Sequence, residues 1–205
     1  MRIKNLSFVQ FGFRLLWKYL QRDKRRTLLA LSSQKSVWVE TGTYVGHTTA
    51  LLSEANKFIF SIEPIARFVK KARKKLAAQD NVYILKGTSE SELRKILSHI
   101  SSNSGLLEME FGTDWNLNFF LDGHNSGLGT FRGELISPIE MELAIIAEFS
   151  LTLPINYICI DDWRLFGDSE IVEGYPLKSS IYQYFPSAFY ETSILSDIFI
   201  AKKNS

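Results

Sequence analysis

The fold is decided by the stretch Val37-Trp38-Val39-Glu40-Thr41-Gly42-Thr43-Tyr44-Val45-Gly46-His47-Thr48-Thr49, in which a β-rich run leads through a glycine turn into a helical pattern. Gly42 can adopt a positive φ and let backbone N–H groups come close to a ligand, and Gly46 permits tight contact between the helix and a strand. The turn is therefore predicted to be a ligand-binding loop.

Further β-rich runs and helical patterns alternate along the chain after this turn. The predicted strands are 37–40, 58–62, 82–85, 117–121, 155–160, 189–194 and 198–201, and the predicted helices are 47–55, 65–78, 89–101, 136–151 and 177–185. Such alternation indicates βαβ units and a parallel sheet. Only Leu195, Ser196 and Asp197 separate the last two runs, which predicts a hairpin with an antiparallel final strand. We expect a doubly wound α/β domain of seven strands with helices on both faces, and a polar loop at 101–105.

The first 35 residues form a separate basic segment in the sequence. They contain nine Lys or Arg and one acid, Asp23, while the whole chain has a net charge of only +2. Apolar residues at spacings of three and four predict an amphipathic helical segment over 8–31: Phe8, Phe11, Leu15, Leu16, Tyr19 and Leu20. We therefore divide the chain into an extension, 1–35, and a domain, 36–205. The extension is interpreted either as a solvated helix or as a peripheral contact with anionic lipid, nucleic acid or an acidic partner, although no stacking motif supports nucleic acid.

An acid closes the second predicted strand. Glu63 follows the glycine turn by about 20 residues, where a carboxylate can accept hydrogen bonds from both ribose hydroxyls of a nucleoside; the alternative is an acid stabilised by a helix dipole. The turn has the spacing G-x-x-x-G and lacks the G-x-G-x-x-G of dinucleotide sites, which disfavours NAD.

The order E-x-G-x-x-x-G and then an acid resembles motifs one and two of class I S-adenosylmethionine-dependent methyltransferases, which have a Rossmann-like fold. The resemblance implies that Glu40 and Gly42 lie near the methionine end of the cofactor and that Glu63 holds its ribose. It extends the cofactor site to the turn and the start of the next helix, to the loop after the third strand and to the end of the fourth strand: Thr43, Tyr44, Gly46, Thr48, Gly87, Thr88, Ser89 and Asp122. Thr88 stands where the family usually has an acid that contacts adenine.

Three aspartates and a histidine follow the fourth and fifth strands. Because neighbouring parallel strands end at one edge, Asp122, His124, Asp161 and Asp162 are expected to converge there. Crowded carboxylates suit a hard cation such as Mg²⁺, for which Asp122, Asp161 and Asp162 are the candidate ligands. His124 is the candidate general base, with Asp122 as its catalytic partner. The structural alternatives are that Asp162 caps the next turn, that Asp161 pairs with Arg164, and that His124 only bonds a loop carbonyl.

Longer motifs resemble an uncharacterised bacterial group of methyltransferase-like proteins. They are D-[AG]-H-x-S-G at 122–127, P-I-x-x-E-L at 138–143 and I-D-D-x-R-L-F-G at 160–167. A more distant resemblance is to sugar O-methyltransferases, in which such aspartates bind Mg²⁺. Glu140 and Glu142 are interpreted as acids that are stabilised by the dipole at the N-terminus of a helix. The glycine-rich stretch 123–133 is a candidate lid.

These patterns predict an S-adenosylmethionine-dependent methyltransferase (EC 2.1.1 class) that acts on a hydroxyl group of a small molecule or sugar-containing acceptor. Two alternatives stay open: a non-catalytic module that binds the cofactor, and a metal-dependent hydrolase or hydroxylase-like enzyme. No run is long and apolar enough to span a membrane, nucleic acid is not expected as a partner, and a homodimer is considered. The single cysteine, Cys159, excludes an intrachain disulfide, which favours the cytoplasm.

Overall fold

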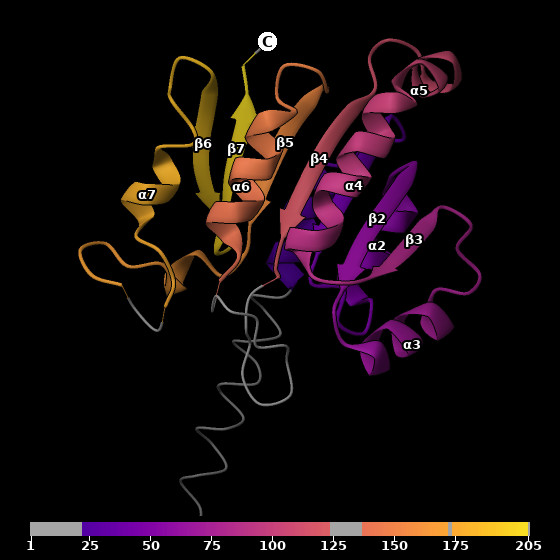
Figure 1. Cartoon of the computed structure of the whole chain (residues 1–205), viewed down its shortest axis with the longest axis horizontal. Helices are drawn as coiled ribbons and strands as arrows, with labels where there is room; N and C mark the ends of the chain where they lie inside the picture. Colours follow the sequence, from indigo (N-terminus) through magenta and orange to yellow (C-terminus); the bar gives the residue numbers. More distant parts are fainter. Residues whose placement is uncertain (1–21, 124–136, 172–173, 205) are drawn as a thin grey trace, which may run out of the picture.

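A seven-stranded sheet forms the centre of the protein, and the computed structural model describes it through residues 22–123, 137–171 and 174–204. The strands are β1 (Ser36–Thr41), β2 (Phe58–Glu63), β3 (Val82–Lys86), β4 (Asn116–Leu121), β5 (Ile155–Ile160), β6 (Tyr190–Leu195) and β7 (Ile198–Lys203). They lie in the order β3-β2-β1-β4-β5-β7-β6 (Figure 1). The five strands from β3 to β5 are parallel, whereas β7 is antiparallel to both neighbours. This confirms the predicted sheet and its antiparallel last strand.

Helices cover both faces of the sheet because alternate side chains of each strand point to opposite sides. Val37 and Val39 of β1 join the core cluster that contains residues of α4 (Ser89–Ser102), α6 (Ile139–Glu148) and α7 (Lys178–Tyr182). Trp38 between them joins the other cluster, with Leu52 of α2 (His47–Ala55). Further helical elements are α3 (Ala66–Lys75), α5 (Ser104–Phe111) and the 3₁₀ turn η1 (Trp163–Leu165).

The described part of the basic segment, which begins at residue 22, packs on the domain. Residues 22–30 are helical, as the periodicity of 8–31 predicts, and residues 8–21 lie outside the described residues. Leu28 is 2% exposed and belongs to the cluster of Trp38 and Leu52. This helix therefore packs on the same face of the sheet as α2. Among the described residues, no helix has both the length and the apolar character needed to cross a membrane.

The prediction of a polar loop at 101–105 was wrong, because α4 continues to Ser102 and α5 begins at Ser104. In α5, Leu107 and Phe111 pack against the core but Leu106 and Met109 are exposed, so the apolar residues lie around the helix and form no single stripe that would reveal it. Three predicted helices are also too long at their ends: α3 ends at Lys75, α6 begins only after Pro138, and α7 is confined to Lys178–Tyr182.

Candidate cofactor and acceptor site

The turn after β1 brings β1 and β4 unusually close. Gly42 has a φ of +88°, and a Cβ at this position would lie 2.3 Å from the carbonyl oxygen of Asp122. Only glycine therefore fits. The N–H groups of Gly42 and Thr43 donate to the carbonyl of Ile62, at 3.0 and 3.1 Å, so these two donors fasten the turn to β2 instead of pointing at a ligand.

Gly46 makes a close contact, but with a different element from the one expected. Its φ is +76°, and an added Cβ would lie 3.0 Å from Leu76 Cδ1 and 3.3 Å from Ala72 Cβ. The tight packing is thus between the start of α2 and the far end of α3, and the expectation of contact with a strand is corrected. Thr48 lies half-buried in the first turn of α2.

The Glu63 carboxylate spans the turn and the start of α3. One oxygen accepts the N–H of Tyr44 and the other accepts the N–H of Ile65, both at 2.8 Å. Burial raises the pKa of Glu63, although these two hydrogen bonds oppose the change. Each carboxylate oxygen has two lone pairs, so both can still accept a ribose hydroxyl.

Glu40 lies one layer deeper and is 1% exposed. Its Oε2 accepts the hydroxyls of Thr49 and Ser61, each at 2.5 Å, and Thr43 Oγ1 lies 2.5 Å from Ser61 Oγ. Burial raises the pKa of Glu40 to about 7, against the lowering effect of the two hydroxyls. This carboxyl joins β1, β2 and α2 beneath the turn.

The loop after β3 lies beside the end of β2, as the cofactor assignment requires. The N–H of Gly87 donates to the carbonyl of Glu63 at 3.2 Å. Thr88 is the N-cap position of α4, and Ser89, the first helical residue, is buried. An added Cβ at Gly87 would lie 2.8 Å from Glu92 Oε1. An acid therefore reaches this loop from the next helical turn, although Thr88 occupies the usual position of the acid.

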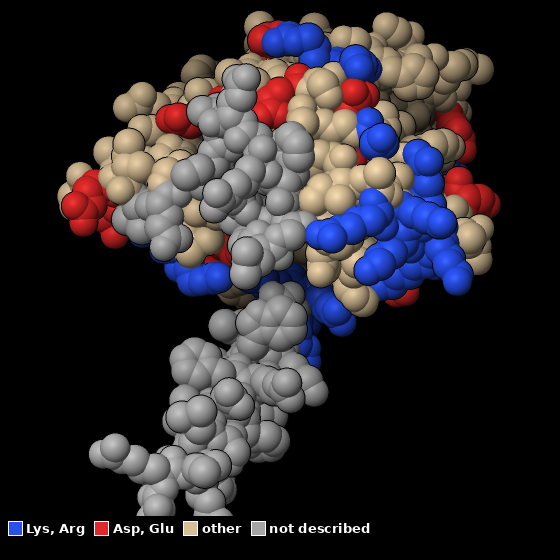
Figure 2. Space-filling model, turned by 60° about the horizontal axis from the view of Figure 1, so that its bottom comes forward, with Lys and Arg blue, Asp and Glu red and all other residues tan. Residues whose placement is uncertain are grey.

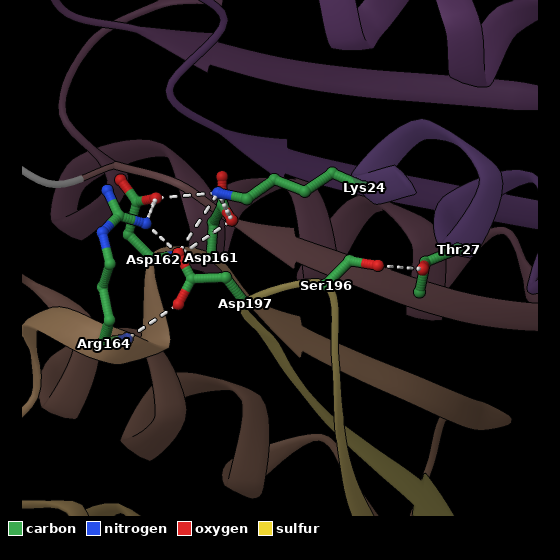
Figure 3. A network of polar contacts seen from close by, with 7 residues as sticks. All are labelled: Lys24, Thr27, Asp161, Asp162, Arg164, Ser196 and Asp197. Atoms are coloured by element: carbon green, nitrogen blue, oxygen red, sulfur yellow. Dashed lines mark hydrogen bonds and ion pairs between the residues drawn. The ribbon is translucent and has the colours of Figure 1, made fainter. Parts of the chain in front are cut away.

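The three aspartates do meet at the carboxyl edge, where one oxygen of each of Asp122, Asp161 and Asp162 lies within 4.8 Å of the others. Burial, followed by the charges of Asp161 and Asp162, raises the pKa of Asp122 well above its ordinary value. Lys24 from the helix 22–30 reaches into this group (Figure 3). Its Nζ lies 2.5 Å from Asp161 Oδ1 and 2.7 Å from Asp162 Oδ1.

The pairings within this cluster differ from those expected. Arg164 pairs with Asp162 at 2.7 Å and also with Asp197 in the β6–β7 turn, whereas Asp161 pairs with Lys24 (Figure 3). The side chain of Asp162 does not cap the following turn, which it precedes with a φ of +51°. The alternatives considered for Asp161 and Asp162 are thus corrected.

The residues present do not fit a divalent cation at this cluster. The Lys24 side chain is only 8% exposed, and its ammonium lies against two of the three candidate ligands. Burial lowers the pKa of Lys24, but the charges and hydrogen bonds of Asp161 and Asp162 outweigh burial and raise it. The cluster therefore contains its own cation, in the position that a metal ion would need.

A further group of polar atoms lies between β1, β4 and α6. An added Cβ at Gly123 would lie 3.1 Å from Thr41 Oγ1 and from Glu142 Oε1. Within the described part of the chain, Thr41 Oγ1 is buried without a hydrogen-bond partner. This hydroxyl faces Gly123 at the end of β4, and its hydrogen-bonding capacity is unused within the described residues. His124 and the candidate lid beyond Gly123 lie outside the described residues.

Four residues of this region were missed by the motif analysis: Lys24, Thr41, Ser61 and Asp197. Lys24 lies among Arg22, Arg25 and Arg26, and only its burial distinguishes it from them. Asp197 belongs to a hairpin turn whose position beside β5 follows from the strand order. Thr41 lies inside the glycine motif, so its place next to Gly42 was the one signal available.

The sequence matches no protein-family model and no curated protein. Solved structures share its fold at low identity. A protein from Streptococcus mutans, described as a methyltransferase and solved with SAH, is 14% identical with a TM-score of 0.54, over 88% of this chain and 96% of that one. A protein from Clostridium thermocellum, described as an rRNA methylase, is 14% identical with a TM-score of 0.54, over 88% and 95%. The N-methyltransferase NodS from Bradyrhizobium japonicum is 10% identical with a TM-score of 0.52, over 91% and 97%. The chain thus has the Rossmann-like α/β fold that these methyltransferases share.

Proposed function

We propose that this protein is an S-adenosylmethionine-dependent methyltransferase that methylates a hydroxyl group of a small molecule or sugar-containing acceptor. One observation carries the proposal: the carboxylate of Glu63 lies across the turn after β1, at the carboxyl edge of the sheet and beside the point where the strand order reverses between β1 and β4. Ligands of open α/β sheets bind at this point. The Streptococcus mutans structure with SAH supports the same reading.

The residues of the turn divide the proposed cofactor site into three parts. Glu63 accepts the ribose hydroxyls, and the loop of Gly87, Thr88 and Ser89 borders the base. Thr41 Oγ1 offers a hydrogen bond near the methionine end on the α6 side of β1, whereas the buried Glu40 supports the turn from the α2 side. The sulfonium of the bound cofactor supplies the methyl group, and the protein holds the acceptor oxygen in line with it.

On the acceptor side, Asp122 and His124 are proposed to take the proton of the attacking hydroxyl. Asp122 lies at the end of β4, adjacent to the turn, because its N–H donates to the carbonyl of Thr41 at 3.0 Å. Lys24 and Arg164 balance the charge of the neighbouring aspartates. No magnesium ion is part of this proposal, and the alternative of a metal-dependent hydrolase loses its support from the aspartates because Lys24 occupies them.

Calorimetric titration with S-adenosylmethionine and S-adenosylhomocysteine tests the cofactor site. Glu63→Gln keeps the shape of the side chain and removes its charge. Because a hydrogen bond to a charged group contributes about 1.5–3 kcal/mol, the affinity for both compounds should fall roughly 10- to 100-fold. Glu54→Gln, an exposed carboxyl of α2, is the matched control and should bind normally. Gly42→Asp is a less specific probe than Glu63→Gln, because any side chain there also displaces the Asp122 backbone.

Failure of the folded wild-type protein to bind either compound would overturn the proposal. If binding is found, methyl transfer is measured on a panel of hydroxylated acceptors. Binding without transfer to any of them would instead favour the non-catalytic module.

A further inference from the structure

A basic face covers α3 and the neighbouring end of the helix 22–30. We define it as Arg25 together with the six cations of α3: Arg67, Lys70, Lys71, Arg73, Lys74 and Lys75. All seven residues are exposed, and α3 contains no acid. Figure 2 shows Lys and Arg side chains gathered in one broad group on this side of the molecule.

The two helices contribute to one surface and not to separate patches. Lys75 Nζ contacts His47 Nδ1 at the start of α2. Burial and then the positive charge of Arg25 lower the pKa of Lys75, and burial, the charge of Lys75 and then that of Arg25 lower the pKa of His47. Arg25 therefore lies close enough to the end of α3 for the like charges to repel one another.

Five of the six cations of α3 are not neutralised by an acid in the part of the chain that the structure describes. Within the described residues, Lys70, Lys71, Arg73, Lys74 and Lys75 form no ion pair with an acid. Lysines elsewhere do form such pairs: Lys35 with Asp114, Lys57 with Glu110 and Lys95 with Glu92. A concentrated charge of one sign that the fold leaves uncompensated is suited to an external polyanion.

The chain that precedes residue 22 indicates which polyanion. In the sequence, residues 8–21 immediately precede the helix of Arg25, and their apolar positions at spacings of three and four include Phe8, Phe11 and Tyr19, with Arg14 and Lys18 between them. Apolar and aromatic residues combined with cations are typical of segments that bind at a membrane interface. Stable peripheral binding requires two signals, an apolar insertion and a polybasic patch. This sequence contains both kinds of signal.

We propose that the basic face binds the surface of a membrane that contains anionic lipids. This interaction is independent of the proposed methyl transfer. It also places the carboxyl edge of the sheet near the lipid surface, because the start of α2 at that edge packs against α3 through Gly46.

Co-sedimentation of the full chain with vesicles tests the proposal. Vesicles of phosphatidylcholine alone are compared with vesicles that also contain phosphatidylglycerol. The variant Lys70→Gln/Lys71→Gln/Lys74→Gln removes three charges from the basic face, and the variant Lys35→Gln/Lys57→Gln/Lys95→Gln removes three exposed charges elsewhere. At about 1 kcal/mol for each cation near an anionic surface, the first triple variant should bind roughly 100-fold more weakly, and the second should bind almost normally.

The apolar signal is tested in the full chain by Phe11→Gln/Leu15→Gln, which should also weaken binding to the anionic vesicles. Equal binding to both kinds of vesicle, equal losses in the two triple variants, or tighter binding of the basic face to a single-stranded RNA oligonucleotide than to vesicles would each overturn the proposal. Circular dichroism shows that each variant is folded. Titration with S-adenosylmethionine is run in parallel, so that failure of the cofactor proposal is seen separately.

Discussion

Lys24 Nζ lies 2.5 Å from Asp161 Oδ1, and this contact joins the helix before β1 to the end of β5. The Lys24 side chain is 8% exposed and that of Asp161 is 10% exposed. The hydroxyls of Thr27 and Ser196, 3.3 Å apart, connect the same helix to the β6–β7 turn (Figure 3). The basic segment is thus attached to the acceptor side of the proposed site.

We expect Lys24→Met to lower the free energy of unfolding by about 3 kcal/mol, because removal of one partner leaves buried carboxylates without compensation. Denaturation in urea measures this loss. Arg26→Met is the control, since Arg26 is 68% exposed in its pair with Asp23 and should lose less than about 1 kcal/mol. In Lys24→Met/Asp161→Asn, the loss should be smaller than the sum of the two single losses. Strict additivity would show that the pair is not coupled.

Lys24→Met should also create a cation site that the wild type lacks. The variant keeps Asp122, Asp161 and Asp162 within 4.8 Å of one another but removes the ammonium between them. Carboxylate oxygens at this spacing suit Ca²⁺ or Mg²⁺. We expect Ca²⁺ to raise the melting temperature of the variant and EDTA to reverse the effect, with no response in the wild type. A similar response of the wild type would restore the magnesium hypothesis.

The sequence was sufficient for the sheet because each strand has its own signal. β1 to β5 are short apolar runs, each followed by a helix or a turn, and the interval 195–197 is too short for anything but a hairpin. The glycines of the turn were likewise predictable, since their positive φ reflects a local requirement of the backbone.

Most of the contacts at the site could not be predicted, because they join residues that are remote in sequence. Periodicity places Lys24 on a helix but does not show which of the neighbouring cations points inward. The sequence offered Arg164, three residues away, as a possible partner of Asp161. In the structure, Lys24 pairs with Asp161, and Arg164 pairs with Asp162. The sequence also did not show that the N–H groups of Gly42 and Thr43 donate to the carbonyl of Ile62. Glycine spacing shows where a backbone can bend but not which acceptors its N–H groups bind.

Glu40 should make stability depend on pH. Its pKa of about 7 in the folded state lies above the ordinary value of 4.5, so the folded protein holds a proton that the unfolded chain releases. The stability that depends on protonated Glu40 is fully present below pH 4.5, and it is lost as the pH rises to about 7. Glu40→Gln should therefore gain stability relative to the wild type across this interval, by about 3 kcal/mol at most. Urea denaturation at a series of pH values measures the difference, with Glu54→Gln as the control. A difference that is constant with pH would contradict the raised pKa.

The closeness of β1 and β4 predicts opposite effects for two glycine substitutions. Gly42→Ala places a Cβ 2.3 Å from the carbonyl oxygen of Asp122 and forces a positive φ on alanine, so we expect a loss of about 3 kcal/mol or more in the free energy of unfolding. Gly105→Ala is the matched control: it lies in α5 with no atom within 4 Å of the added Cβ, and it should be neutral or stabilise the protein by up to about 1 kcal/mol. Urea denaturation compares the two. Gly42 also fastens the turn that carries the proposed cofactor contacts. Gly42→Ala should therefore weaken S-adenosylmethionine binding even where the protein remains folded. Equal affinities in the two variants would show that the turn is not part of the cofactor site.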